Sequence, residues 1–437
     1  MRERQQFAPI VVARTGGTME TDAAVVPSRR VRVYGRPFDA DSYALRDFLS
    51  RSVVQFDWFP VDVGGVGGAV RIDPSRLPLV VFPDGTELVA PTLREVADRL
   101  GWIHAPRRQE YDLSIYGAGP AGLSAAVYAA SEGLDVVLLE RDAVGGQAGS
   151  SSLIENYLGF PEGIAGADLA ERAREQAVRF GAELLVMREG VRGVFHDGRI
   201  HADLADGGHV VARANICATG VEWRRLGLQR EQELLGCGVY YGAGTSEADG
   251  CAGEQVFVVG GANSAGQAAM NLSRSAAHVT MLVRGASLSA TMSEYLSARI
   301  AAAPNVTVRT GCRVSALHGD TRLESIEVTD GDGATVSLPA TRLFICIGGR
   351  PDTSWAEQTP MVRDRLGYLV TGPDLDAADG SLDQWPLERR PFWLETNVPG
   401  SFAAGDVRAG SVKRVAAAVG EGAMAVTFVH RHLATSD

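Results

Sequence analysis

A glycine-rich turn between two apolar strands constrains this chain most. An apolar run from Tyr111 leads into Gly117, Gly119 and Gly122, and a helix of small residues and a second apolar run ending on Glu140 follow. In a βαβ unit of this pattern, the first glycine makes a tight turn, the second lets backbone N–H groups approach a pyrophosphate, and the third allows close helix–strand packing. We therefore expect a dinucleotide-binding unit in which Glu140 accepts hydrogen bonds from a ribose.

Size, charge and hydropathy narrow the class of protein further. The chain has 437 residues, of which 45% are hydrophobic, so we expect two or three domains with sizeable cores. A net charge of −11 and a pI near 5.3 argue against nucleic acid or an anionic membrane as partner. No apolar run reaches membrane-spanning length and the N-terminus lacks a signal-peptide core, so we expect a cytoplasmic protein.

The cysteines are scattered along the chain. The five are Cys217, Cys237, Cys251, Cys312 and Cys346, and no two of them form a CxxC motif. This spacing indicates neither a disulfide framework nor a metal site. Cys217 and Cys346 fall in apolar runs, where we expect small buried side chains.

The N-terminal quarter of the chain shows a β-α-β-β-α pattern. Residues 1–28 have no periodicity and predict a flexible leader, and residues 29–105 form what we call the N-terminal module. The expected strands are 31–34, 54–59 and 79–82, with a Gly-rich loop at 64–68; the expected helices are 42–51 and 92–100, the second opened by a capping box of Thr92 and Glu95.

The N-terminal module resembles a glutaredoxin-like domain with a thioredoxin fold. The resemblance rests on Tyr34-Gly-Arg-Pro37 and on Leu77-Pro78, which is similar to the cis-proline loop of that family. The two positions where the family carries cysteines are Asp39 and Ser42, so thiol–disulfide exchange by the module is excluded. We expect a docking or scaffolding role; an equally weighted alternative is a packing role, as a dimer or lid element.

Further motifs accompany the glycine-rich turn in what we call the first nucleotide domain, residues 106–224 and 348–437. Gly-Gly-Gln147, Glu-Asn156-Tyr, Ala-Thr-Gly220 and Ala-Gly-Asp406 resemble the FAD domain of thioredoxin reductases, a branch of the pyridine nucleotide–disulfide oxidoreductases. The resemblance implies a helix over 412–430 whose basic start lies by the flavin. It implies an FAD site of Gly117, Gly119, Pro120, Ala121, Gly122, Glu140, Arg141, Gly146, Gln147, Asn156, Ala218, Thr219, Gly220, Gly405, Asp406, Arg414 and Val415.

A second nucleotide domain is expected at residues 225–347. Its fingerprint is read as G-x-G-x-x-A with Ala262 at the middle position, and Arg284 ends the next strand. A cation there suits a 2′-phosphate and favours NADPH, with NADH as the alternative; Arg284 as a solvated strand-end cation is the competing interpretation. The expected NAD(P)H site consists of Gly260, Gly261, Asn263, Ser264, Ala265 and Arg284.

The chain departs from the thioredoxin reductases at the redox centre. The two cysteine positions of their CxxC correspond to Gly242 and Thr245, and Cys237 and Cys251 are too poorly spaced to replace them. We therefore name no certain catalytic residue. The prediction is an α/β protein with two Rossmann-like FAD/NAD(P)-binding domains and a thioredoxin-fold module.

The functional prediction follows from this departure. We expect a homodimeric FAD-dependent NAD(P)H oxidoreductase that passes electrons directly to a small-molecule or redox-protein acceptor, without ordinary reduction of thioredoxin. The alternative is an FAD-containing redox-sensing or interaction protein with little turnover.

Overall fold

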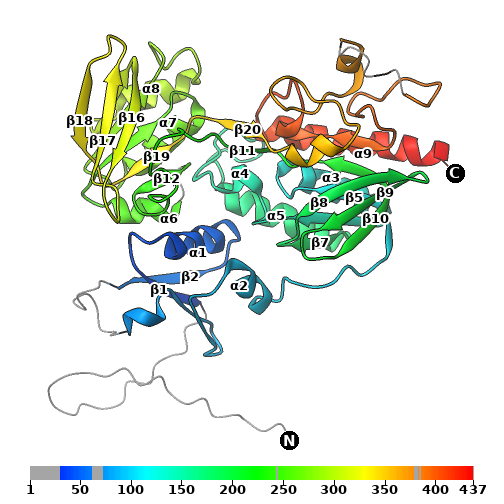
Figure 1. The fold of residues 1–437 in the computed structure, drawn as a ribbon, viewed down its shortest axis with the longest axis horizontal. Helices are drawn as coiled ribbons and strands as arrows, with labels where there is room; N and C mark the ends of the chain where they lie inside the picture. The colour runs from blue at the N-terminus through cyan, green and yellow to red at the C-terminus, as the bar shows by residue number, and fades with distance from the viewer. Residues whose placement is uncertain (1–29, 62–71, 243–244, 378–381, 383–384, 437) are drawn as a thin grey trace, which may run out of the picture.

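A computed structural model describes residues 30–61, 72–242, 245–377, 382 and 385–436 (Figure 1). The predicted leader at 1–28 and the predicted Gly-rich loop at 64–68 lie outside these residues. Among the helices of the described ranges, none combines the length and apolar character that a membrane crossing requires.

In the N-terminal module, a four-stranded sheet has the order β2-β1-β3-β4. Strand β1 runs parallel to β2 and antiparallel to β3, and β3 and β4 form a hairpin. The elements are β1 (Val31–Gly35), α1 (Ala40–Arg51), β2 (Phe56–Pro60), the 3₁₀ turn η1 (Pro74–Arg76), β3 (Leu79–Val81), β4 (Glu87–Val89) and α2 (Leu93–Arg99).

Two predictions for this module need correction and one is confirmed. Helix α1 begins at Ala40, not at residue 42, because the Asp39 carboxylate caps it by accepting from the Ser42 N–H at 2.9 Å. Strand β4 was not predicted, since its three residues are too short for a periodic signal. The capping box of Thr92 and Glu95 is present at α2.

The first nucleotide domain is built on a sheet of order β7-β6-β5-β10-β9-β8, with β21 beside β10. Strands β5, β6, β7, β10 and β21 are parallel, whereas β8 and β9 pair antiparallel. The elements are β5 (Glu110–Tyr116), α3 (Pro120–Ser131), β6 (Val136–Glu140), α4 (Gly146–Gly149), α5 (Gly166–Arg179), β7 (Glu183–Val186), β8 (Gly190–His196), β9 (Arg199–Leu204), β10 (His209–Cys217), η3 (Ser354–Gln358), η4 (Gly372–Ala377), β21 (Ser401–Ala403), η5 (Gly405–Val407) and α9 (Val415–Ser436).

The prediction of a helix over 412–430 is wrong at both ends. Lys413 has φ of 59°, a left-handed conformation that an α-helix does not accept, so α9 starts only at Val415. It then continues to Ser436 and packs along α3 of the glycine-rich turn. The buried side chains of α3 and α9, among them Ala125 and Val429, share one apolar core with the sheet.

The second nucleotide domain has a parallel sheet of order β12-β19-β13-β14-β15 and an antiparallel sheet of order β16-β17-β18. An antiparallel ribbon of β11 and β20 joins the second nucleotide domain to the first. The predicted domain boundaries at 224 and 348 fall beside this ribbon, and they stay a prediction. The elements are β11 (Val221–Trp223), β12 (Val239–Tyr241), α6 (Thr245–Ala248), η2 (Asp249–Cys251), β13 (Gln255–Val259), α7 (Asn263–Leu272), β14 (His278–Val283), α8 (Glu294–Ala302), β15 (Val306–Thr310), β16 (Cys312–His318), β17 (Ser325–Asp330), β18 (Thr335–Pro339), β19 (Leu343–Ile345) and β20 (Gly349–Pro351).

The three parts meet around one junction. In Figure 1 the N-terminal module lies below the two nucleotide domains, with α1 beneath α6 of the second domain. The ribbon of β11 and β20 crosses between the nucleotide domains above it. Residues from all three parts line one cavity at this junction.

Candidate functional site

The glycine-rich turn between β5 and α3 has glycine where other residues would not fit. Gly117 has φ of 100°, and a Cβ on it would collide with the carbonyl oxygen of Ala218. A Cβ on Gly122 would collide with the carbonyl oxygen of Gly117, which is the close packing expected of the third glycine. A Cβ on Gly119 would meet no heavy atom within 4 Å, so this position faces open space.

Glu140 stands at the end of β6, next to the turn. Its side chain is buried, and its carboxylate accepts hydrogen bonds from the N–H groups of Ala118 at 2.8 Å and Asp142 at 2.9 Å. Burial raises the pKa of Glu140, and the two N–H donors act in the opposite direction. The backbone thus fixes the carboxylate at the site where a ribose is expected.

A large cavity, called the cofactor cavity below, lies between the two nucleotide domains and measures about 2470 Å³ including its open mouth. Of the predicted FAD residues only Gly122, which packs behind Gly117, is not part of its lining. The second nucleotide domain contributes Asn263, Ser264 and Gly242 to the same cavity. The predicted residues Gly260, Gly261, Ala265 and Arg284 do not line it.

Two other segments contact the second fingerprint turn, the strand end at Cys346 and the loop that carries Thr291. A Cβ on Gly260, where φ is 139°, would collide with the carbonyl oxygen of Cys346, whereas Ala262 has extended backbone that any residue adopts. The Thr291 hydroxyl donates to the Gly261 carbonyl at 2.7 Å. Arg284 lies exposed directly after β14, so its guanidinium is available to an anion at this end of the sheet.

At the far end of the cofactor cavity, η5 and the start of α9 bring Asp406, Lys413, Arg414 and Val415 to its wall. The Lys413 ammonium donates to the Asp406 carbonyl oxygen at 2.5 Å and lies 4.1 Å from the ring centroid of Tyr368. Burial lowers the pKa of Lys413 and raises that of Asp406, while their opposite charges act against both shifts.

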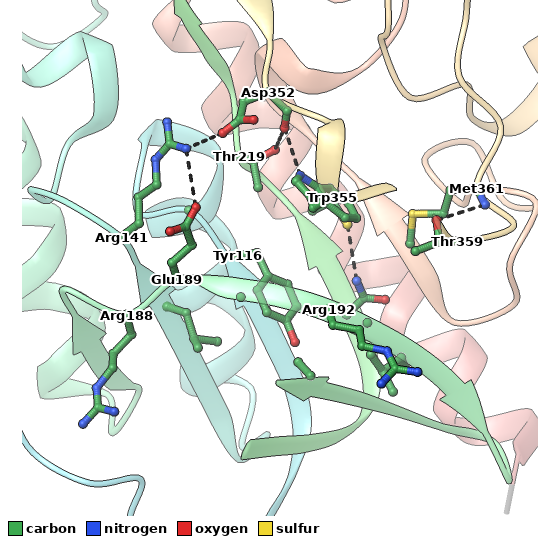
Figure 2. A pocket seen from close by; sticks show the side chains of 18 of the residues that line it. Tyr116, Arg141, Arg188, Glu189, Arg192, Thr219, Asp352, Trp355, Thr359 and Met361 are labelled. Atoms are coloured by element: carbon green, nitrogen blue, oxygen red, sulfur yellow. Dashed lines mark hydrogen bonds and ion pairs between the residues drawn. The ribbon is translucent and has the colours of Figure 1, made fainter. Parts of the chain in front are cut away.

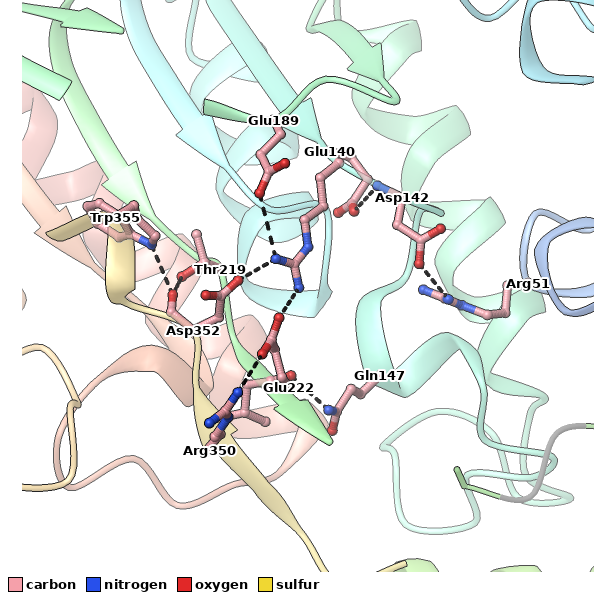
Figure 3. A network of polar contacts seen from close by, with 12 residues as sticks. Arg51, Glu140, Asp142, Gln147, Glu189, Thr219, Glu222, Arg350, Asp352 and Trp355 are labelled. Atoms are coloured by element: carbon pink, nitrogen blue, oxygen red, sulfur yellow. Dashed lines mark hydrogen bonds and ion pairs between the residues drawn. The ribbon is translucent and has the colours of Figure 1, made fainter. Parts of the chain in front are cut away.

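Arg141 belongs to a network that no sequence pattern indicated. It pairs with Asp352 and, at 3.0 Å, with Glu222, whose other oxygen lies 3.6 Å from Arg350 (Figure 3). Gln147 donates to the carbonyl of Val221 at 2.7 Å. These contacts attach the β11–β20 ribbon to the loop that carries Gly-Gly-Gln147.

Glu140 and Arg141 also line a second, smaller cavity of about 860 Å³. Figure 2 shows this smaller cavity, with Arg141 in its wall. Its walls include the apolar side chains of Phe195, Trp355 and Met361. An apolar space next to the carboxylate that is expected to bind a ribose suits the base of a dinucleotide.

No thiol lies at Gly242 or Thr245, the two positions that the sequence resemblance aligns with a CxxC. Gly242 has φ of 71°, and a Cβ on it would approach Cζ2 of Trp223 to 3.2 Å; Thr245 opens α6. All five cysteines are buried and none forms a disulfide in the described ranges. Burial raises the pKa of Cys217 and Cys346 to about 12, as expected for small side chains in strands. The described residues also contain no cluster of side chains suited to a metal ion.

Helix α1 supplies three residues of the cofactor cavity that sequence reasoning missed. They are Tyr43, Asp47 and Arg51, which are spaced by four residues and so share one face of the helix. The spacing is visible in the sequence, but the docking that turns this face to the cavity is not.

Comparisons with known proteins agree with this architecture. Residues 111–422 match the family model of the pyridine nucleotide-disulphide oxidoreductases. The thioredoxin reductase of Treponema pallidum (strain Nichols) is 34% identical over 317 residues, covering 72% of this chain and 95% of that protein; the one of Streptomyces clavuligerus is 35% identical over 323 residues, covering 73% and 93%.

Solved structures give the same result. The thioredoxin reductases of Lactococcus lactis, in its FR conformation, and of T. acidophilum each superpose with a TM-score of 0.66, at 27% and 28% identity, covering 74% of this chain and 99% of theirs. Both lie in the class that combines FAD- and NAD(P)-binding Rossmann-type domains. The chain therefore belongs to the pyridine nucleotide-disulphide oxidoreductase family, with thioredoxin reductases among its relatives.

Proposed function

We propose that the protein is an FAD-dependent NAD(P)H oxidoreductase that works without a dithiol relay and delivers electrons directly to a small-molecule or protein acceptor. The observation that carries the proposal is the shared cofactor cavity. It is lined by Gly119 and Asp406 of the first nucleotide domain, by Ser264 of the second, and by Gly242 where a cysteine would stand.

The residues present fit FAD. The open space at Gly119 leaves room for a pyrophosphate at the N-terminus of α3, and the fixed carboxylate of Glu140 suits a ribose. When bound, FAD would supply the redox chemistry between nicotinamide and acceptor. Lys413 would place a positive charge, and Asp406 a hydrogen-bond acceptor, along the wall formed by η5 and the start of α9.

The missing thiols support direct delivery. Gly242 and Thr245 cannot form a disulfide. The five cysteines are buried, and burial raises the pKa of Cys217, Cys237, Cys312 and Cys346, which disfavours the reactive thiolate. An acceptor must therefore reach the cofactor cavity itself. We propose NADPH as the preferred reductant through Arg284, with NADH as the alternative.

We also propose a thioredoxin fold for the N-terminal module. Support comes from the strand order β2-β1-β3-β4, with β1 parallel to β2 and antiparallel to β3, and from the cis peptide bond at Leu77-Pro78. The domain boundaries, a cytoplasmic location and a homodimer stay predictions.

The test is anaerobic stopped-flow mixing of the yellow protein with NADPH and with NADH, following the absorbance of oxidised flavin. Rapid bleaching by one nucleotide is expected, followed by reoxidation with a small quinone or dioxygen and no transfer to thioredoxin in a coupled insulin assay. If neither nucleotide bleaches the flavin, the proposal fails and the redox-sensing alternative replaces it. Transfer to thioredoxin would contradict direct delivery.

A further inference from the structure

Helix α1 lies outside the family match, which begins at residue 111, yet it forms part of the cofactor cavity. Tyr43, Asp47 and Arg51 face the cavity from successive turns of this helix. A module without thiols therefore contributes to the wall of a site that belongs to another domain.

At its C-terminal end, α1 contacts the loop after Glu140. The Arg51 guanidinium lies 2.8 Å from the Asp142 carboxylate and 3.5 Å from that of Asp47. The backbone N–H of Asp142 donates to the Glu140 carboxylate at 2.9 Å (Figure 3). A chain of three residues thus links the N-terminal module to the carboxylate expected at the ribose.

Arg51 is better placed to orient this loop than to bind phosphate. Two carboxylates, Asp47 and Asp142, already surround its charge, so little positive potential is left for an anion. The side chain of Arg51 is 18% exposed and that of Asp142 is 43% exposed, so water screens their ion pair in part. The same loop continues to Gly146 and Gln147, which line the cofactor cavity.

The loop is also held by apolar packing. Ala143 is fully buried and belongs to the hydrophobic core of the N-terminal module, together with Phe48 of α1 and Val96 of α2. Nearby, Arg94 donates to the Met187 carbonyl of the first nucleotide domain at 3.0 Å. Displacement of the loop would therefore open the core of the module.

At its other end, α1 is anchored to the second nucleotide domain. Arg46 and Glu247 form an ion pair at 2.9 Å with side chains that are 6% and 2% exposed. The Tyr43 ring meets the ring of Tyr240 edge-on, with centroids 5.2 Å apart. Because one helix is fixed on one nucleotide domain and contacts the loop of the other, it can hold that loop in place.

We propose that the N-terminal module is a positioning element of the FAD site. Anchored on the second nucleotide domain, α1 uses Arg51 to hold Asp142, and through its backbone Glu140, in the geometry that binds FAD. The inference rests on the proposed function only in taking FAD as the cofactor, and Arg51 is a positioning residue that acts through Asp142.

The experiment measures FAD release from the diluted holoprotein by the recovery of flavin fluorescence. The variants are Arg51→Met, Arg51→Lys, Asp142→Asn and the double variant Arg51→Met/Asp142→Asn. The matched control is Arg76→Met, which removes an ion pair with Glu87 elsewhere in the same module. Bleaching by NADPH is recorded separately, so that failure of the proposed function leaves this result readable.

We expect Arg51→Met and Asp142→Asn each to weaken FAD binding about tenfold, which corresponds to the loss of one hydrogen bond to a charged group. The variant Arg51→Lys should bind FAD almost as tightly as the natural protein. The double variant should bind FAD no more weakly than either single variant, and Arg76→Met should bind FAD as tightly as the natural protein. Unchanged FAD release in both single variants overturns the proposal. An equal loss in Arg76→Met also overturns it, because the effect would then reflect general instability of the module.

Discussion

Replacing Gly119 by alanine separates the cofactor role of the glycine-rich turn from its role in folding. Gly119 has φ of −76° and ψ of −176°, which alanine adopts without strain, and a Cβ there would meet no heavy atom within 4 Å. The apoprotein should therefore keep its stability or gain up to about 1 kcal/mol, since alanine restricts the unfolded chain. The methyl group would, however, occupy the space left for the pyrophosphate.

The expected loss is in FAD affinity alone. Removing one hydrogen bond to a charged phosphate costs about 1.5 to 3 kcal/mol, so the dissociation constant should rise about tenfold to a hundredfold. Fluorescence titration of the apoprotein with FAD measures the affinity, and thermal unfolding without FAD measures the stability.

Gly122→Ala is the contrasting variant. Its Cβ would collide with the carbonyl oxygen of Gly117, so unfolding of the apoprotein should become easier by about 1 to 3 kcal/mol. If Gly119→Ala binds FAD as tightly as the natural protein, the turn does not hold the pyrophosphate and the reasoning is refuted. Equal destabilisation of the apoprotein by both variants would refute the separation of roles.

Three further predictions address nucleotide choice and the missing thiols. The substitution Arg284→Leu should raise the KM for NADPH about tenfold and leave the KM for NADH unchanged. Arg274→Leu, at another exposed arginine, is the control, and equal effects of Arg284→Leu on both nucleotides would exclude recognition of the 2′-phosphate. Introducing cysteines by Gly242→Cys and Thr245→Cys should not produce thioredoxin reduction in an insulin assay, because α1 packs against α6; measurable reduction would contradict that barrier. An aromatic disulfide reagent should label no thiol in the native protein at pH 8 and five thiols after denaturation, because the cysteines are buried and burial raises the pKa of Cys346 to about 12. The slow labelling rate of the native protein should rise about tenfold per pH unit below pH 12, and fast labelling at pH 8 would refute the burial.

The parts of the site that follow from local sterics could be predicted from the sequence. Gly122 is glycine because the Gly117 carbonyl oxygen of the same turn leaves no room for a side chain, and at Gly117 the Ala218 carbonyl oxygen has the same effect; Glu140 ends the strand beside them. The same holds for Gly260 in the second nucleotide domain. Only the partner of Gly122 lies in the same short stretch of sequence. The partners of Gly117 and Gly260 are Ala218 and Cys346, which lie in a predicted turn and a predicted strand.

The parts that depend on docking could not be predicted. Arg51 and Asp142 are 91 positions apart, and neither residue type nor spacing indicates that they meet. The network of Arg141 likewise recruits Glu222 and Asp352 from the inter-domain ribbon. The start of α9 was misplaced for a different reason, because a left-handed Lys413 leaves no trace in the helical periodicity of the residues around it.

The same docking closes off Asp39 and Ser42, the two positions where the resemblance to glutaredoxin-like domains would place cysteines. Asp39 and Ser42 are hydrogen-bonded to each other at the first turn of α1, where Ser42 is fully buried. This end of α1 packs against the second nucleotide domain, and a Cβ on Gly236 would approach Cα of Ala40 to 2.9 Å. Disulfide exchange requires that a partner disulfide reach the thiol. The contact of α1 with the segment around Gly236 therefore closes Asp39 and Ser42 to a partner disulfide, which favours a structural role of the module over disulfide exchange.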